Sequence, residues 1–323
     1  MLHFLNEKRY RPDVSERREV RGRVVLSPLR YPGGKRRLMP YVAATLEANG
    51  LRPDLFVEPF TGGGSVALEL LATGRVEKIG LAERDPYVAS FWQTVFFDSD
   101  WLCSRVRSIE VSLAKWEWMK RTEFTTIRNQ AIACLFLNRT SFNGALNGRA
   151  GPIGGKAQRS SYKIDCRFPR ERLVRRIRAC ARLADKVAFV RLASALDVVA
   201  DVHREFQEDS VFFYFDPPFW AKSSRLYRYS FNTADHEQLA TALRYLEKPY
   251  LLSYDPAPEV ERLYQQHDKA KIERVELLYT ATQRTAEEEL VITNLEETPQ
   301  DTRLWRTHAE WTQLRRRRSS VRA

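Results

Sequence analysis

The chain has 323 residues, and its 53 lysines and arginines outnumber its 41 acidic residues, which gives a formal net charge of +12. This excess favours a polyanionic partner such as nucleic acid, although a basic protein without such a partner has the same composition. The four cysteines form no Cys-x-x-Cys pair, so we expect reduced thiols and no metal site. The sequence has no apolar run of about 18 residues and no visible secretory signal, so we expect a cytoplasmic protein without a membrane span.

The first elements in chain order form a compact pattern. Residues 1–26 are a polar, basic lead-in. The apolar run "LFVEPF" (55–60) predicts a buried strand, the glycines after it a tight turn, and residues 66–74 a helix. A second strand is predicted over 78–84. One strand–helix–strand unit implies a parallel sheet with helices on its faces, and hence an α/β fold.

The middle of the chain differs in composition. Helical patterns cover 88–97 and 129–138, and a strongly basic helix is predicted over 171–186. Between them, residues 138–163 are rich in glycine, asparagine, serine and basic residues, so we expect an exposed functional loop.

Strand patterns return after residue 186. The predicted strands are 187–193, 210–215, 249–254 and 289–294, with helices over 235–247 and 257–266. The polar tail from 298 ends in "LRRRRSSVRA" and is expected to be disordered. The chain therefore starts an α/β domain, leaves it, and returns to it.

The glycine turn "FTGGGS" (60–65) is the first candidate binding feature. Glycine lets a ligand approach the backbone, but no lysine follows as in a phosphate-binding P-loop, and the full G-x-G-x-x-G dinucleotide pattern is missing. Glu83 ends the next strand about twenty residues later, where nucleotide folds place the acid that binds ribose hydroxyls. A nucleoside site is favoured over a plain glycine turn with a surface glutamate.

The stretch "FYFDPPFW" (213–220) is the second candidate. Asp216 ends a predicted strand, where open α/β sheets bind ligands. Pro217 and Pro218 fix the backbone and remove N–H donors, which leaves acceptors only. A carboxylate beside a rigid carbonyl suits an amino group with two hydrogens, and Phe219 can stack on the ring that carries it. The alternative is an ordinary Asp-Pro turn.

Seven motifs occur together in a fixed order: "RYPGGK" (30–35), "FVEPFTGGGS" (56–65), "LAERDP" (81–86), "LNRTSFNG" (137–144), "FDPPF" (215–219), "LLSYD" (251–255) and "ELVITN" (289–294). In this order they resemble the Dam-like class of adenine-specific DNA methyltransferases, which use S-adenosylmethionine. The resemblance implies a Rossmann-like, seven-stranded methyltransferase sheet, mostly parallel with one reversed strand, and an inserted, mainly helical target-recognition domain. The implied division is a lead-in (1–26), a discontinuous catalytic domain (27–102 and 186–297), the insertion (103–185) and a basic tail (298–323).

The resemblance also assigns roles to individual residues. It implies catalysis by Asp216, Pro217, Pro218 and Phe219, and cofactor binding by Tyr31, Lys35, Phe60, Gly62, Gly64, Glu83 and Asp216. It implies DNA contacts from Arg30, Arg139, Phe142 and Asn143. In one departure, Ala193 stands where relatives often carry an acid that contacts the cofactor, and Asp197 comes later.

The expected reaction is direct methyl transfer to the exocyclic amine of an adenine flipped out of double-stranded DNA. Arg175, Arg176 and Arg178 in the basic helix are expected to track phosphates. A monomer is favoured, and a cognate restriction or defence protein is a possible partner. Three alternatives stay open: an RNA adenine methyltransferase, a cytosine-amine methyltransferase, and a DNA-binding protein without catalysis.

Overall fold

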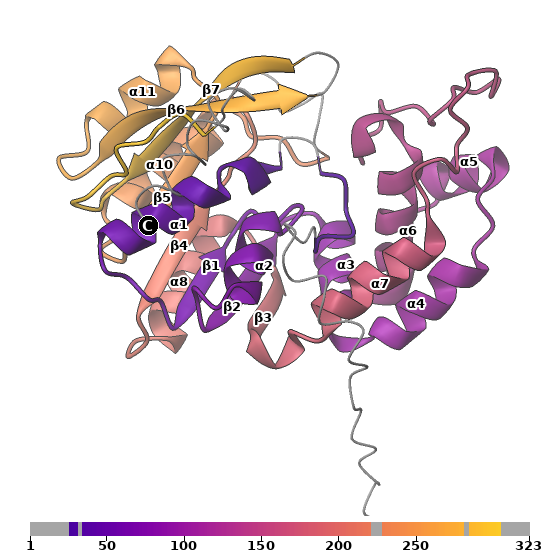
Figure 1. Ribbon diagram of the computed structural model, residues 1–323, viewed down its shortest axis with the longest axis horizontal. Coiled ribbons are helices and arrows are strands. Elements are labelled where there is room, and N and C mark those ends of the chain that lie inside the picture. The colour runs from indigo at the N-terminus through magenta and orange to yellow at the C-terminus, as the bar shows by residue number, and fades with distance from the viewer. Residues whose placement is uncertain (1–25, 32–33, 221–227, 281–283, 305–323) are drawn as a thin grey trace, which may run out of the picture.

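In the computed structural model, the described residues are 26–31, 34–220, 228–280 and 284–304, and they fold around one seven-stranded sheet (Figure 1). The strand order is β3-β2-β1-β4-β5-β7-β6. The strands are β1 (Leu55–Glu58), β2 (Lys78–Glu83), β3 (Val187–Leu192), β4 (Val211–Phe215), β5 (Tyr250–Tyr254), β6 (Lys271–Thr280) and β7 (Arg284–Thr293).

The direction of the strands confirms the predicted sheet. Neighbours from β3 to β5 pair in parallel, whereas β7 pairs antiparallel with both β5 and β6. One strand is therefore reversed. Because the chain leaves β1 outward to β2 and β3 and later returns to β4, the strand order switches direction between β1 and β4. Ligands bind at such a point, beyond the carboxyl ends of the strands.

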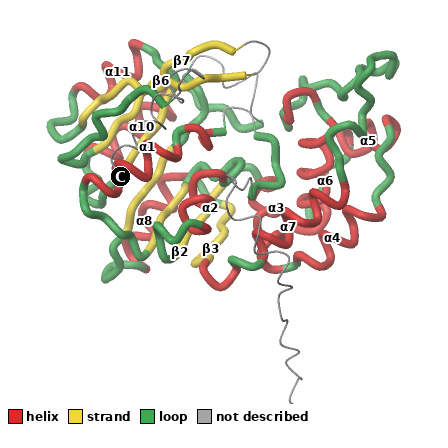
Figure 2. Tube along the Cα trace, viewed as in Figure 1, coloured by secondary structure: helices red, strands yellow, loops and turns green. Residues whose placement is uncertain are grey.

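The central strands are buried on both faces because both faces are covered by helices (Figures 1 and 2). Alternate residues point to opposite faces: Phe212 and Tyr214 pack with α1 (Met39–Ala48), α2 (Ser65–Ala72) and α3 (Pro86–Phe97). Phe213 and Phe215 join the core under α8 (Ala195–Glu205), α10 (Thr233–Arg244) and α11 (Pro258–Gln265). This burial explains why these strands are continuous apolar runs.

Between α3 and β3 the chain forms a mainly helical region, drawn at the right of Figure 1. It contains α4 (Ser99–Ser108), α5 (Leu113–Arg121), α6 (Ile127–Thr140) and α7 (Arg170–Ala181), with short 3-10 turns at Phe142–Gly144 and Ala184–Lys186. Phe136 of α6 and Ile177 of α7 belong to the same hydrophobic core as Trp92 of α3 and Phe56 of β1. This helical region therefore packs onto the sheet through a continuous core.

Some sequence-based predictions need correction. The loop expected from residue 138 begins later, because Asn138, Arg139 and Thr140 form the buried last turn of α6. The tail expected to be disordered from 298 is ordered at its start, since Glu276 N–H donates to Thr302 O and Leu304 N–H to Glu276 O. Residues 1–25 of the lead-in and 305–323 of the tail lie outside the described residues.

The sequence patterns named no element at β6, nor at α1, α4, α5 or α8. β6 is an edge strand that pairs with β7 along its whole length, so its structure depends on a hairpin partner more than on its own composition. No helix in the described part of the chain is long and apolar enough to span a membrane.

Candidate active site

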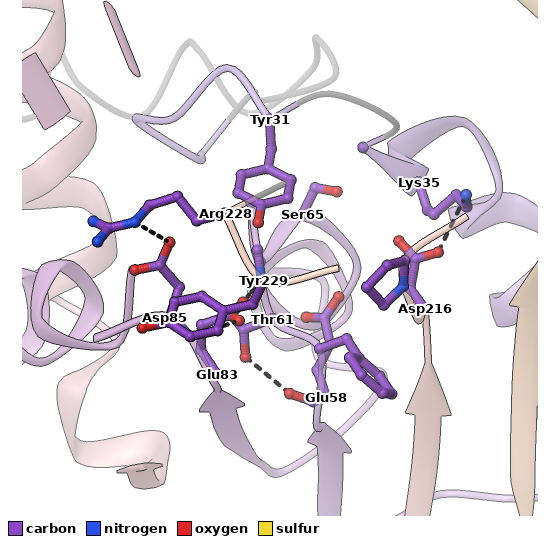
Figure 3. A pocket seen from close by; sticks show the side chains of 16 residues that line it. Tyr31, Lys35, Glu58, Thr61, Ser65, Glu83, Asp85, Asp216, Arg228 and Tyr229 are labelled. Atoms are coloured by element: carbon purple, nitrogen blue, oxygen red, sulfur yellow. Dashed lines mark hydrogen bonds and ion pairs between the residues drawn. The ribbon is translucent and has the colours of Figure 1, made fainter. Parts of the chain in front are cut away.

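A pocket lies beyond the carboxyl ends of β1, β2 and β4, at the switch in strand order between β1 and β4 (Figure 3). The residues that line it come from the glycine turn, from the segment before α1 and from the ends of these strands. They are Tyr31, Gly34, Lys35, Glu58, Phe60, Thr61, Gly62, Gly63, Gly64, Ser65, Glu83, Asp85, Asp216, Pro218, Arg228 and Tyr229. All seven residues predicted to bind the cofactor are in this set.

The glycine turn connects β1 to α2 through two left-handed residues. Gly62 has φ +42° and Gly64 has φ +58°, backbone angles that residues other than glycine adopt only with strain. A Cβ on Gly62 would lie 2.6 Å from the ring of Tyr31, and one on Gly64 would lie 3.0 Å from the ring of Trp92. Trp92 also donates its Nε1–H to Gly62 O at 2.9 Å, so the turn is held from below. The glycines are required both for the backbone geometry and for the approach of two aromatic rings.

Glu83, at the end of β2, is locked to the backbone of two turns. Its Oε2 accepts from Gly62 N at 2.9 Å, and its Oε1 accepts from Arg84 N at 2.9 Å and Asp85 N at 3.2 Å. Burial and the neighbouring charge of Asp85 nevertheless raise the pKa of Glu83 to about 7. The carboxylate is thus firmly oriented and becomes fully ionised only above neutral pH.

Two further acids face the same pocket and were not predicted from the sequence (Figure 3). Glu58 ends β1 and is only 3% exposed; burial, then the charges of Asp216 and Glu83, raise its pKa well above the ordinary value. Asp85 caps α3 by accepting from Tyr87 N at 2.9 Å and lies 3.8 Å from Arg228 Nε. Four carboxylates around one pocket repel one another, and a bound cation would relieve that repulsion.

Asp216 is fixed by three neighbouring elements. Its Oδ1 accepts from Ser253 Oγ on β5 at 3.0 Å and lies 3.1 Å from Lys35 Nζ. Ser253 Oγ in turn lies 2.9 Å from the hydroxyl of Tyr214 on β4. Burial raises the pKa of Asp216, and the Lys35 ammonium opposes that rise. Both contacts use Oδ1, and the side chain is 22% exposed, so Oδ2 is the oxygen offered to the pocket.

The Lys35 ammonium contacts three side chains of the site: Asp216, Glu289 and Phe219. It stands in the 3-10 turn Lys35–Arg37, and its ammonium lies 3.3 Å from Glu289 Oε2 on β7 as well as 3.1 Å from Asp216. The same Nζ lies 4.8 Å from the ring centroid of Phe219. A side chain expected to close the cofactor pocket therefore also contacts the predicted catalytic motif.

The Asp-Pro-Pro-Phe turn is supported from behind by an aromatic cluster. Trp220 N–H donates to Asp255 Oδ1 at 2.9 Å, and the Trp220 ring lies 4.7 Å from the buried imidazole of His236. His236 Nδ1 is 2.5 Å from Tyr254 OH, and burial lowers its pKa to about 4, so it is neutral at physiological pH. The rings keep the turn in place without adding charge to it.

The predicted DNA-binding residues near α6 divide into buried and exposed groups. Arg139 is 4% exposed and donates from Nε (2.8 Å) and Nη2 to Pro28 O; burial, then the charge of Arg176, lower its pKa to about 9. Arg30 is partly buried, and its backbone N–H donates to Asn138 Oδ1. By contrast Phe142 is 65% exposed, and Asn143 is exposed with a left-handed φ of 55°.

The arginines predicted on the basic helix also divide by exposure. Arg175 and Arg178 are exposed on α7, whereas Arg176 is partly buried and donates to Ser27 O at 3.2 Å. Burial, then the charge of Arg172, lower the pKa of Arg176. Arg139 and Arg176 thus donate to the carbonyls of residues 28 and 27. The pKa values of both are lowered by burial and by neighbouring arginines.

Ala193, which stands where relatives often carry a cofactor-binding acid, directly follows β3. Ala193 N–H donates to Glu83 O at 3.2 Å, so this residue lies beside the predicted ribose acid. The nearest later acid, Asp197, is engaged at the start of α8, where it accepts from Ser194 Oγ at 2.7 Å. Leu192 is 57% exposed at the same strand end.

Of four pocket or neighbouring residues that the sequence did not predict, two could be recognised by their position in the sequence and two could not. Glu58 lies two residues before the glycine turn, and Asp85 lies two residues after Glu83 in the motif "LAERDP", so both could have been found from position alone. Ser253 and Glu289 lie inside strand motifs, and only the arrangement of β4, β5 and β7 brings them to Asp216. In the described part of the chain, His, Cys, Asp and Glu form no group suited to a metal ion.

A seven-stranded sheet with one reversed strand, a glycine turn and an acid ending the second strand are the features that the resemblance to methyltransferases using S-adenosylmethionine predicts. The family model of the D12 class N6 adenine-specific DNA methyltransferases matches residues 31–281, so the chain belongs to this family of enzymes. S-adenosylmethionine is their methyl donor, and the pocket fits it, since its two positive charges suit a site lined by four carboxylates.

No curated protein matches the chain. Among solved structures, the chain is similar to the precorrin-6y C5,15-methyltransferase of Geobacter metallireducens GS-15, with 11% sequence identity and a TM-score of 0.32. The match covers 78% of this chain and 84% of that chain. The assignment to a family rests on the family model, not on this weak likeness.

Proposed function

We propose that this enzyme methylates the exocyclic amine of a specific adenine that is flipped out of double-stranded DNA. The observation that carries the proposal is Asp216, whose Oδ1 is held by Ser253 and Lys35 while Oδ2 faces the pocket. An adenine amine is a weak nucleophile, because its lone pair is delocalised into the ring. A carboxylate that accepts one amine hydrogen stabilises the positive charge that develops on nitrogen.

The cofactor would lie against the glycine turn. S-adenosylmethionine supplies an electrophilic methyl group. Glu83 is suited to accept hydrogen bonds from ribose hydroxyls, because its carboxylate ends β2 and is already oriented by backbone N–H groups. Glu58, buried beside Asp216, is suited to a cationic ammonium group, which would lower its raised pKa.

The target base would be held by the Asp-Pro-Pro-Phe turn. Pro217 and Pro218 supply no N–H donors, so the turn offers acceptors to the amine. Phe219 can stack on the flipped base and offset part of the few kcal/mol that flipping costs. The ammonium of Lys35 near the Phe219 ring helps to hold that ring in place.

The DNA would meet the side of the molecule formed by α7 and the 142–143 turn. The exposed Arg175 and Arg178 are suited to phosphates, and the exposed Phe142 and Asn143 to bases or the space left by a flipped base. Arg139, by contrast, is proposed to act from the interior, by holding residues 27–30 in position.

The decisive experiment is sequencing of modified bases in DNA from a host without adenine methylation of its own. Expression of the wild type should produce methyladenine in a recurring sequence context, which would also reveal the recognition site. The Asp216→Ala variant, expressed at the same level, should not. Unmodified DNA from the folded wild type, or modification confined to RNA, would contradict the proposal.

A further inference from the structure

Glu289 presents an unusual arrangement within β7. Three consecutive glutamates, Glu287, Glu288 and Glu289, stand in this strand, and alternation along the strand places Glu288 on one face and Glu287 and Glu289 on the other. Glu287 and Glu288 are exposed, and Glu288 pairs with Arg274 at 2.9 Å. Glu289 is 4% exposed and points to the Lys35 ammonium, 3.3 Å away. A buried carboxylate is costly unless its charge serves a paired group.

We infer that Glu289 is a positioning residue that shares Lys35 with Asp216 and thereby sets how strongly Asp216 accepts hydrogen bonds. This inference rests on the proposed function, since it concerns the proposed catalytic carboxylate. One ammonium that is 2% exposed contacts two carboxylates, at 3.1 Å and 3.3 Å. Its positive charge is divided between them, so Asp216 is neutralised less than it would be in a simple pair with lysine.

The consequence for the reaction follows from charge. An Asp216 tightly neutralised by Lys35 would be a poor acceptor for the adenine amine, whereas an Asp216 without Lys35 would be protonated in its buried site. By sharing Lys35, Glu289 keeps Asp216 ionised but incompletely neutralised, between these two limits. Glu289 also keeps Lys35 charged and oriented while Asp216 turns its other oxygen to the substrate.

Other charged and titratable groups face Asp216, and none of them is changed in the variants used for the test. Glu58 approaches from β1, Tyr214 from β4, Tyr254 from β5 and Asp255 from the turn after β5, and each interacts electrostatically with Asp216. Glu289 differs from them because its carboxylate forms an ion pair with the lysine that Asp216 itself contacts.

The test is the titration of the Asp216 side-chain carboxyl by 13C NMR, with Asp216→Asn to assign the signal. Glu289→Gln removes one negative charge, so the pKa of Asp216 should fall by about one unit. The matched control is Glu288→Gln, which neutralises the preceding residue of the strand on the exposed side and should leave the titration unchanged. An unchanged or raised Asp216 pKa in folded Glu289→Gln would overturn the inference.

If Glu289→Gln does not fold, Lys35→Met provides the test. Without the ammonium, Asp216 and Glu289 form a like-charged pair, and Asp216 should titrate in two steps. A single step would overturn the inference.

The readout in the absence of DNA separates this inference from the proposed function. If the wild type methylates no adenine but Asp216 titrates as expected, the function is wrong and the coupling stands. If adenine is methylated and Glu289→Gln leaves the titration unchanged, the inference is wrong and the function stands. In single-turnover assays with saturating cofactor, the acid limb of the pH–rate profile of Glu289→Gln should move to lower pH by the same amount as the carboxyl pKa.

Discussion

The pocket at the ends of β1, β2 and β4 and the arginine-rich side around α7 have opposite charge within one strongly basic chain. In the pocket, Glu58, Glu83, Asp85 and Asp216 gather with few cations, and burial raises their pKa values. Around α7, arginines gather, and burial and mutual repulsion lower the pKa values of Arg139 and Arg176.

The comparison shows that the net charge of +12 describes neither region. Each region is strained by like charges that its proposed ligand would neutralise: a cationic cofactor in the pocket and a polyanion on the arginine side. The two also differ in how charge is used. The acids line an open pocket, whereas two of the predicted DNA-binding arginines hold backbone carbonyls.

The largest effect is expected at Asp216. Asp216→Ala should lower the rate of methyl transfer by about 10²–10³, because it deletes one group that stabilises charge in the transition state. The measurement is single-turnover methylation of DNA with saturating cofactor. Glu288→Gln is the control: it removes one exposed negative charge, which pairs with Arg274 and does not line the pocket, so its rate should stay close to wild type. Wild-type turnover by Asp216→Ala would remove Asp216 from the mechanism.

A smaller effect is expected at Glu83, in cofactor affinity. Glu83→Gln should weaken binding about 10- to 100-fold, since hydrogen bonds to a charged group contribute about 1.5–3 kcal/mol. In the wild type, affinity should rise as pH increases towards 7, because Glu83 has a pKa of about 7 and, in the proposed role, would accept hydrogen bonds from ribose best when ionised. Isothermal titration at several pH values checks this. A pH dependence that is the same in Glu83→Gln would assign it to another group.

The same pKa makes a prediction about stability. The pKa of Glu83 is raised by folding from 4.5 to about 7, so the folded state binds more protons between these values. The contribution of Glu83 to stability is therefore present below pH 4.5 and is lost as pH rises through 7. Denaturant unfolding of the wild type and Glu83→Gln should diverge across this window, and parallel curves would contradict the assigned pKa.

The arginine side can be divided by stability measurements. Arg139→Met should lower the free energy of unfolding by about 1–3 kcal/mol, because it leaves the buried Pro28 carbonyl without its donor. Arg175→Met, an exposed change on α7, should stay within about 0.5 kcal/mol of wild type. If both variants unfold like the wild type, Arg139 does not hold the 27–30 segment.

The smallest effect concerns salt dependence. Each phosphate contact adds about 0.9 to the slope of log affinity against log salt concentration. Replacing the exposed Arg175 and Arg178 with alanine should reduce that slope by up to about 1.8, whereas adding Arg176→Ala should change it little, since Arg176 is partly buried against Ser27. An unchanged slope would place the phosphate contacts elsewhere on the molecule.

How much of this could be predicted from sequence depended on whether the signal was local. The glycine turn, Glu83 and the Asp-Pro-Pro-Phe turn are short motifs at strand ends, and the topology of an α/β sheet brings such ends together, so the predicted pocket residues were found. β6 was missed because its structure depends on pairing with β7 more than on its own composition. Arg139 reads as an exposed basic residue beside a polar loop, and only the fold reveals that it is buried under residues 27–30.

The pairing of Lys35 with Glu289 was beyond sequence analysis for the same reason. The two residues are separated by most of the chain, and the interaction requires β7 to be inserted between β5 and β6. Nothing in the run of three glutamates marks the third as buried until its pairing with Lys35 is known.

The most direct test of the central claim is nucleoside analysis of double-stranded DNA treated with the enzyme and methyl-labelled S-adenosylmethionine. The arrangement around Asp216 and the family of the chain predict label in N6-methyladenine, with Asp216→Ala as the blank. Label in methylcytosine with none in methyladenine would contradict the account.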